Sequence, residues 1–254
     1  MAYKALITSW KWGLLSDETE EKTGRAMAES LLHIAKKEVK SGKLGSLGQV
    51  FRLFTSFPRQ RVVYIGWRRG KRTMYEFWEL FYRIILSGQS AEITMGALDE
   101  AGIVAVDRLD HEFIEVFKEQ KGAGIQLGVL SVAFDYFIRS CLTSAGHSDL
   151  FDTIVANDIQ QDQGLLSGIT LDIYAEKPQF LKERFLVPLG IDAADVIYHG
   201  GSEQDYGIAE MLPEGNFIVS RHVPEEFRDK FVSEYGAFAP GSADELRQYL
   251  ATRT

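Results

Sequence analysis

Short apolar runs alternate along most of this chain with segments of helical periodicity, and this alternation limits the possible folds more than any other feature. Alternating strands and helices favour βαβ units, in which helices cover both faces of a mostly parallel sheet. Such an α/β sheet, wound in both directions, binds ligands beyond the carboxyl ends of its strands. The predicted strands are 4–8, 125–131, 151–156, 195–199 and 216–220, and the predicted helices between and after them are 134–145, 178–187, 203–212 and 224–235.

Two further local signals stand out in this part of the chain. The sequence Ser242-Ala-Asp-Glu245 is a capping box, which predicts the start of a last helix that docks through Leu246 and Leu250. The segment 160–171 contains two glycines and predicts a small β-hairpin that projects from the sheet.

One long segment, 17–108, interrupts the alternation. Its apolar residues recur at helical spacing in 26–39, 74–86 and 91–101, without a strand between them. A chain of 254 residues and 28.6 kDa can build one sizeable core with an appendage but is short for two full domains. We therefore predict an α/β core formed by 1–16 and 109–254, with an inserted helical cap at 17–108.

Charge is distributed unevenly between these two parts. The whole chain has 28 basic and 36 acidic residues and a net charge of −8, which disfavours attraction to nucleic acid by the overall field. The stretch 39–75 nevertheless holds nine basic residues, no acid and several aromatic residues. Arginines such as Arg68, Arg69 and Arg72 could grip a phosphorylated ligand, a single strand or an anionic surface. The alternative is that this basic segment packs against the acidic core or an acidic second subunit.

Cysteine and histidine usage limits the metal chemistry. The single cysteine, Cys141, excludes an internal disulfide and a multi-cysteine zinc or iron–sulfur site, and it fits a reducing compartment. The five histidines lack the HxxxH and HExxH spacings of helical zinc sites. No apolar stretch approaches the roughly 18 residues of a transmembrane helix, and the N-terminus does not read as a signal peptide. We expect a cytoplasmic protein without a membrane span.

Four motifs resemble those of a known superfamily. The run 128–139, followed by 151–158, resembles the haloacid dehalogenase (HAD) superfamily, nearest to its phosphoserine-phosphatase-like branch. Lys177-Pro-Gln-Phe-Leu looks like the third motif of that family, and His199-Gly-Gly-Ser-Glu-Gln-Asp205 is similar to the fourth, usually Gly-Asp-Ser-x-x-Asp. The resemblance covers about 125–212. It implies a HAD-like, Rossmann-type sheet with strand order 3-2-1-4-5 and a variable helical cap after the first strand.

The resemblance also implies a mechanism for typical members. An aspartate at the end of the first strand attacks phosphate, and a second aspartate two residues on acts as acid and base. A serine or threonine and a lysine hold the phosphoryl oxygens, while carboxylates bind magnesium.

This sequence departs from that pattern at the chemical centre. Alignment of 5–15 with the first motif puts Ser9 at the nucleophile position and Lys11 at the acid/base position. The first acidic residue of the chain is Asp17, beyond the first strand, and Gly201 replaces the first aspartate of the fourth motif. Asp205 matches the second. We therefore expect weak or absent magnesium binding and no cofactor.

The residues that remain still suit an oxyanion. We predict that a small phosphorylated or anionic ligand binds between core and cap, and that the protein is a pseudoenzyme without catalysis. Lysines, hydroxyl groups and backbone N–H groups can hold such a ligand. The predicted contacts are Ser9, Lys11, Ser131, Lys177, Ser202 and Asp205, with cap contacts at Arg68, Arg69 and Arg72.

Structural interpretations of the same residues stay open. Ser131 could cap the helix that follows it, and Lys177 could be an exposed lysine before a helix that starts at Pro178. Asp205 could pair with Lys11 or Lys177, or cap a turn. Ser9 and Lys11 could be a strand-end serine and a solvated lysine that remain after loss of function.

Two other functions are retained as alternatives. A Ser9–Lys11 pair on one side of an extended segment could support metal-independent hydrolysis. The basic cap could instead make the protein a polyanion-binding module. A protein partner or a second copy of the chain is a further candidate, and nucleic acid is a less favoured one.

Overall fold

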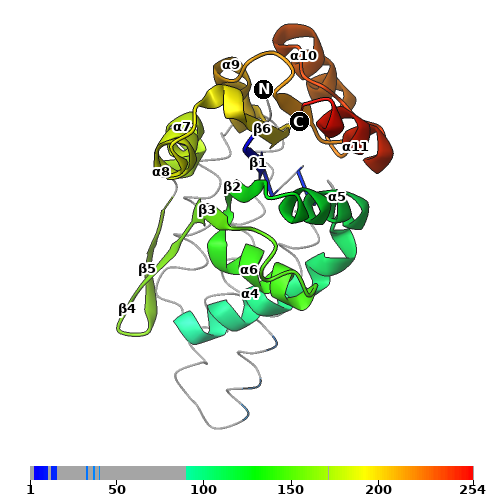
Figure 1. Ribbon diagram of the computed structural model, residues 1–254. Coiled ribbons are helices and arrows are strands. Elements are labelled where there is room, and N and C mark those ends of the chain that lie inside the picture. Colours follow the sequence, from blue (N-terminus) through cyan, green and yellow to red (C-terminus); the bar gives the residue numbers. More distant parts are fainter. Residues whose placement is uncertain are drawn as a thin grey trace.

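A sheet of five parallel strands forms the centre of the computed structural model, which describes residues 3–10, 13–15, 33, 37, 40, 90–170 and 172–253. The strand order is β3-β2-β1-β6-β7, which confirms the predicted 3-2-1-4-5 arrangement of a doubly wound α/β sheet (Figure 1). The strands are β1 (Ala5–Thr8), β2 (Gln126–Phe134), β3 (Thr153–Asn157), β6 (Val196–Gly200) and β7 (Phe217–Val219).

Helices cover both faces of this sheet. Alternate residues of β1 point to opposite sides: Leu6 joins one core cluster, while Ala5 and Ile7 join the other. The first cluster includes residues from α4 (Ala91–Ala105), α5 (His111–Gly122), α6 (Asp135–Ser144) and α11 (Ala243–Ala251). The second includes residues from α7 (Asp172–Leu181), α9 (Tyr206–Met211) and α10 (Glu225–Tyr235).

The last helix, α11, begins with most of the predicted capping box. Ser242 is the N-cap, and its hydroxyl accepts a hydrogen bond from the Glu245 N–H at 3.2 Å. The Glu245 carboxylate accepts from the N–H of Gly241 at 2.7 Å, one residue earlier than the reciprocal bond of a capping box. Leu246 and Leu250 are buried as expected.

The helix predicted at 178–187 begins earlier and is interrupted. It starts at Asp172, breaks at Glu176 (φ −125°, ψ 29°) and contains Pro178. Because Pro178 lacks an N–H and its ring clashes with the carbonyl group four residues earlier, a break in the turn ahead of it has a local cause. The chain then continues through a π-helical turn, Lys182–Leu186, into α8 (Val187–Leu189). Single 3-10 turns occur at Val106–Arg108, Ala193–Asp195 and Glu203–Asp205.

The predicted hairpin is present. β4 (Ile159–Asp162) and β5 (Leu165–Ile169) pair antiparallel and project from the sheet at the left of Figure 1. The Gly164 carbonyl at the turn accepts a hydrogen bond from the Ala91 N–H at 2.8 Å. The hairpin tip is thereby tied to the start of α4.

The described part of the predicted insertion is its last helix. The helix expected at 91–101 is α4, which extends to Ala105 and packs against α6, where the Tyr136 hydroxyl donates to Asp99 at 2.9 Å. Leu15 and Leu109 form an antiparallel bridge, so the points where the chain leaves and re-enters the predicted core are adjacent. The helices expected at 26–39 and 74–86 lie outside the described residues, apart from helical positions 33 and 37. The domain limits remain a prediction.

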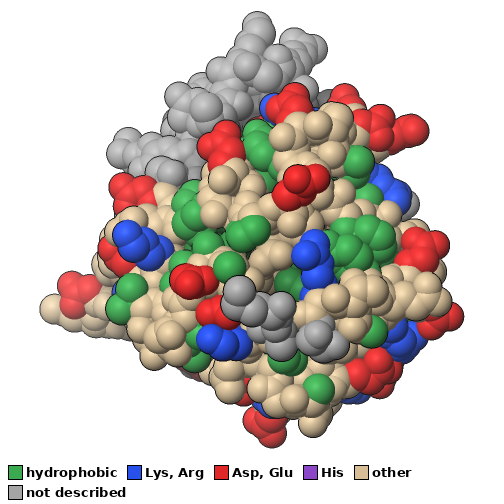
Figure 2. Space-filling view, turned by 45° about the horizontal axis from the view of Figure 1, so that its top comes forward, with side chains coloured by type: hydrophobic (Ala, Val, Ile, Leu, Met, Phe, Trp, Pro, Cys, Tyr) green, Lys and Arg blue, Asp and Glu red, His purple; other side chains and the backbone are tan. Residues whose placement is uncertain are grey.

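Two general features complete the description. Among the described helices, none has the length and apolar character needed to cross a membrane. Acidic and basic side chains are interspersed with hydrophobic ones on the face shown in Figure 2.

Candidate functional site

Ser9 is fixed at the carboxyl edge of the sheet, one residue after β1. Its N–H donates to the His199 carbonyl of β6 at 2.8 Å, and its own carbonyl accepts from the Thr8 hydroxyl at 2.9 Å. Ser9 is 3% exposed. The neighbouring strand and the preceding side chain therefore hold the backbone of the predicted nucleophile position in place.

Lys177 reaches this serine from the interrupted helix α7. Its ammonium group donates to Ser9 Oγ at 3.3 Å and to Asp205 Oδ1 at 2.5 Å. The side chains of Lys177 and Asp205 are 1% and 0% exposed, so they form a buried ion pair. Asp205 thus pairs with one of the two lysines that the sequence offered as partners, and Lys177 is not an exposed lysine.

Five hydrogen bonds converge on the Asp205 carboxylate. Oδ1 accepts from Lys177 and from the Tyr198 hydroxyl at 3.0 Å. Oδ2 accepts from the N–H of Gly201 at 3.0 Å and from the N–H and hydroxyl of Ser202, both at 2.8 Å. Burial by itself would raise the pKa of Asp205, but the Lys177 charge and these hydrogen bonds lower it below its usual value. Asp205 is held as a saturated anion.

Tyr198 is a site residue that the sequence analysis missed. It lies in β6 with no exposed surface, and its hydroxyl also donates to the Leu130 carbonyl at 3.3 Å. Burial and the neighbouring Asp205 raise the pKa of Tyr198 well above its usual value, while a hydrogen bond with Ser9 lowers it. A tyrosine inside an apolar strand was the available signal, because a buried phenol needs a polar partner.

The other predicted contacts fall into three groups. Ser202 joins the network directly through Asp205. Ser131 is fully buried, and its Oγ accepts from the Ala133 N–H at 3.0 Å. The N-cap of α6 is Phe134, so the alternative that Ser131 caps this helix is wrong. Lys11, Arg68, Arg69 and Arg72 lie outside the described residues.

The comparisons with known proteins give fold similarity without close sequence similarity. No family model matches, and no curated protein matches by sequence. Among solved structures, a HAD-family hydrolase from Salmonella enterica serovar Typhi aligns with 98% of this chain and 72% of its own, at 13% identity and a TM-score of 0.62. A phosphoserine phosphatase described as a phospho-aspartyl intermediate analogue aligns over 100% of both chains, at 18% identity and a TM-score of 0.54. A protein of unknown function from Bordetella pertussis aligns with 94% of this chain and 98% of its own, at 13% identity and a TM-score of 0.63.

The fold is HAD-like. At these identities the similarity establishes the architecture and leaves the chemistry to this chain's own residues. In the HAD-like fold the resemblance assigns the nucleophile to the position of Ser9.

The magnesium that HAD-like phosphatases use does not fit the described residues. Magnesium needs oxygen ligands with free lone pairs in near-octahedral geometry, and the Asp205 oxygens already accept five hydrogen bonds. At Gly201 a Cβ atom would lie 2.2 Å from Cγ2 of Val223, so a metal-binding side chain at this position would collide with Val223. No group of three metal-ligating side chains occurs among the described residues.

Ser9 is also poorly placed for nucleophilic attack. A serine nucleophile needs a base with a lone pair, and Lys177 is the cation of a buried ion pair that donates to Ser9 Oγ. His199, on the adjacent strand, directs Nδ1 to Thr8 Oγ1 at 3.1 Å instead. The described residues can therefore bind and orient an oxyanion better than they can remove the Ser9 proton.

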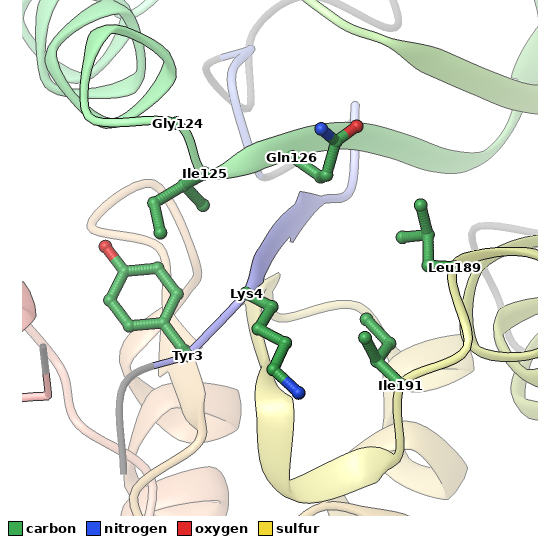
Figure 3. Close-up of a pocket in the computed structure, with 7 residues that line it drawn as sticks. All are labelled: Tyr3, Lys4, Gly124, Ile125, Gln126, Leu189 and Ile191. Carbon is green, nitrogen blue, oxygen red and sulfur yellow. The ribbon is translucent and has the colours of Figure 1, made fainter.

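A separate hollow of about 460 Å³ lies at the opposite, amino edge of the sheet (Figure 3). Its charged side chain, Lys4, pairs with Asp195 at 3.1 Å. The hollow therefore does not belong to the Ser9 site. Its lining residues are Tyr3, Lys4, Gly124, Ile125, Gln126, Leu189 and Ile191.

Proposed function

We propose that this protein is a HAD-like pseudoenzyme that binds a small phosphorylated or otherwise anionic ligand at the Ser9 site, between core and cap, without hydrolysing it. The observation that carries the proposal is the buried Lys177–Asp205 pair beside Ser9. The resemblance implies several carboxylates beside this lysine, whereas the described residues place one saturated carboxylate there. Such a centre repels an anionic ligand less than a set of carboxylates does.

The hydrogen-bond donors near Ser9 support an anionic ligand. An ammonium group has three N–H donors, and Asp205 and Ser9 use two of those of Lys177 among the described residues. The third can donate to a ligand oxygen. A charge-assisted hydrogen bond of this kind is stronger in a buried position than in water, because the effective dielectric constant is lower.

Binding of inorganic phosphate, followed by isothermal titration calorimetry without added metal, tests the proposal. We expect binding by the wild type and at least roughly tenfold weaker binding by the double variant Lys177→Met/Asp205→Asn. Replacing both partners avoids leaving a buried carboxylate without its cation. Lys118→Met is the matched control, because Lys118 is an exposed lysine that pairs with Glu115 at 2.7 Å.

Turnover of a panel of phosphate esters provides the second measurement. The wild type should release no phosphate above background, with or without magnesium. Magnesium-dependent phosphate release by the wild type would contradict a binding-only function, whether or not Asp205→Asn diminishes it.

Metal-independent hydrolysis is the second candidate, and the 3.3 Å contact between Lys177 and Ser9 is the observation in its favour. It requires Lys177 to release a proton despite its ion pair with Asp205. Turnover that persists with a chelator and is abolished by Ser9→Ala would establish this candidate in place of the first.

The polyanion-binding alternative remains a prediction from the sequence, since its arginines lie outside the described residues. Its signature is affinity for single-stranded nucleic acid that falls steeply with salt. A cytoplasmic location and a protein or homodimeric partner are likewise predictions.

A further inference from the structure

A second cluster of charged side chains surrounds the buried carboxylate of Asp110. Arg221 contacts both oxygens of this carboxylate, with Nε and Nη2 each at 2.8 Å, and His222 Nε2 lies 2.8 Å from Oδ2. The N–H of Phe113 donates to Oδ1 at 3.1 Å, so Asp110 is also the N-cap of α5. Burial would raise the pKa of Asp110, but the hydrogen bonds from His222 and Arg221 lower it to about 2. The carboxylate therefore stays charged across the physiological range.

This cluster joins the two connectors of the predicted insertion to the core. Asp110 follows Leu109, which bridges to Leu15, and its N–H donates to the Leu14 carbonyl at 2.9 Å. Arg221 and His222 belong to a different segment, the loop after β7. Three pieces of chain that are far apart in sequence therefore meet at Asp110, one through its backbone N–H and another through its carboxylate.

The loop 220–223 also touches the Ser9 site. The Ser220 hydroxyl donates to the Gly13 carbonyl at 3.1 Å, and the Ser220 N–H donates to the Gly200 carbonyl at 2.8 Å. At its other end, Val223 fills the space beside Gly201. Gly13 is equally confined, because a Cβ atom there would lie 1.8 Å from the Ser9 carbonyl oxygen. A movement of the loop would thus disturb the segments that follow β1 and β6, not the strands themselves.

The polar groups of the cluster form hydrogen bonds with one another. Four donors occupy the Asp110 carboxylate, while Arg221 uses Nη1 for Glu112 at 2.8 Å and stacks over the Phe113 ring at 4.9 Å. A ligand or metal would have to displace these contacts. The cluster is therefore better suited to holding segments of the chain together than to binding a ligand or a metal ion.

We propose that Asp110, Arg221 and His222 form a clamp that fastens the return connector of the insertion and the loop 220–223 to the carboxyl edge of the sheet. Arg221 and His222 are positioning residues in this clamp. It holds the connector in place beside the Ser9 site, so the connector cannot open without breaking the partly buried ion pair between Asp110 and Arg221. The clamp does not depend on what the Ser9 site binds.

Hydrogen–deuterium exchange of the full-length protein tests the clamp. The reporters are peptides that contain Leu15 and Asp110, whose N–H groups bond to Trp10 and Leu14. Arg221→Lys keeps the charge but loses the two-pronged contact with the carboxylate. We expect exchange at these peptides to be roughly tenfold faster or more, with exchange in β6 unchanged, because only local opening becomes easier.

Two further variants keep the test decisive. Arg247→Ala is the matched control: Arg247 pairs with Glu119 and Asp244 at an exposed position, and its loss should leave the connectors unaffected. His222→Ala removes one contact from a partly exposed side chain, and should give a smaller acceleration at the same peptides even where Arg221→Lys does not fold. Connector exchange equal to the wild type in these clamp variants would overturn the proposal. Acceleration that affects β6 equally would also overturn it, because the residues would then serve only general stability.

Discussion

His199 shows how one buried side chain links pH to the stability of the Ser9 site. Its ring packs against Phe113 and Phe117, at centroid distances of 5.4 and 6.0 Å. Since the Thr8 hydroxyl donates to the Ser9 carbonyl, we assign the proton of the neutral ring to Nδ1, which donates to Thr8. Nε2 is buried without a hydrogen-bond partner among the described residues, so protonation there would place an uncompensated charge in the core.

This environment predicts a stability loss in mild acid. Burial lowers the pKa of His199 to about 4, while an unfolded histidine titrates near 6.5. Between these values the unfolded state binds the extra proton, so stability falls as the pH drops from about 6.5 to about 4, by about 3 kcal/mol in total. His199→Asn preserves a donor near Thr8 and removes the titration. Urea unfolding at several pH values should show a flatter dependence in this variant.

The exposed histidine His111 provides the control. His111→Asn should retain the pH dependence of the wild type in this window. If wild type and His199→Asn lose stability in parallel, the buried ring is not the source of the effect.

At the level of elements, the position of Lys177 depends on the contact between α7 and α9. A Cβ atom at Gly207 would lie 2.7 Å from Cγ of Pro178, the rigid ring next to Lys177. Gly207→Ala should therefore destabilise the protein by about 1–3 kcal/mol through overpacking, despite the better helix propensity of alanine. Guanidinium unfolding measures this change.

Gly122→Ala is the matched substitution for that experiment. Gly122 is also helical, at the end of α5, but a Cβ atom there meets nothing within 4 Å. Its replacement should be neutral or stabilising by up to about 1 kcal/mol. Equal effects of the two substitutions would show that the α7–α9 contact tolerates the added methyl group.

The elements also show what sequence reasoning can reach. The strands and the hairpin were predictable because strand and helix periodicities and turn glycines are local signals. The strand order, in contrast, came from the family resemblance. The break at Glu176 was partly foreseeable from Pro178, but the helical turn ahead of it was not. The Lys177–Asp205 pair was one of several interpretations of Asp205 that the sequence left open. Tyr198 and the Asp110 clamp were missed, because their contacts join residues far apart in sequence that only the packed sheet brings together.

On the scale of the whole molecule, position 201 and the loop 220–223 are coupled. Val223 lies where a side chain at position 201 would project, and it belongs to the loop that the proposed clamp holds. An aspartate placed at 201 would therefore force a buried, β-branched residue out of this loop. Valine has few rotamers with which to yield.

This coupling predicts the outcome of an attempt to rebuild the centre. The triple variant Ser9→Asp/Lys11→Asp/Gly201→Asp should bind Mn²⁺ poorly, because the side chain at 201 collides with Val223. Adding Val223→Ala should improve Mn²⁺ affinity, measured by electron paramagnetic resonance, by roughly tenfold or more. Magnesium-dependent turnover of phosphate esters should follow the same order. Equal Mn²⁺ affinity in the triple and quadruple variants would contradict the coupling, because it would show that Val223 does not limit a side chain at position 201.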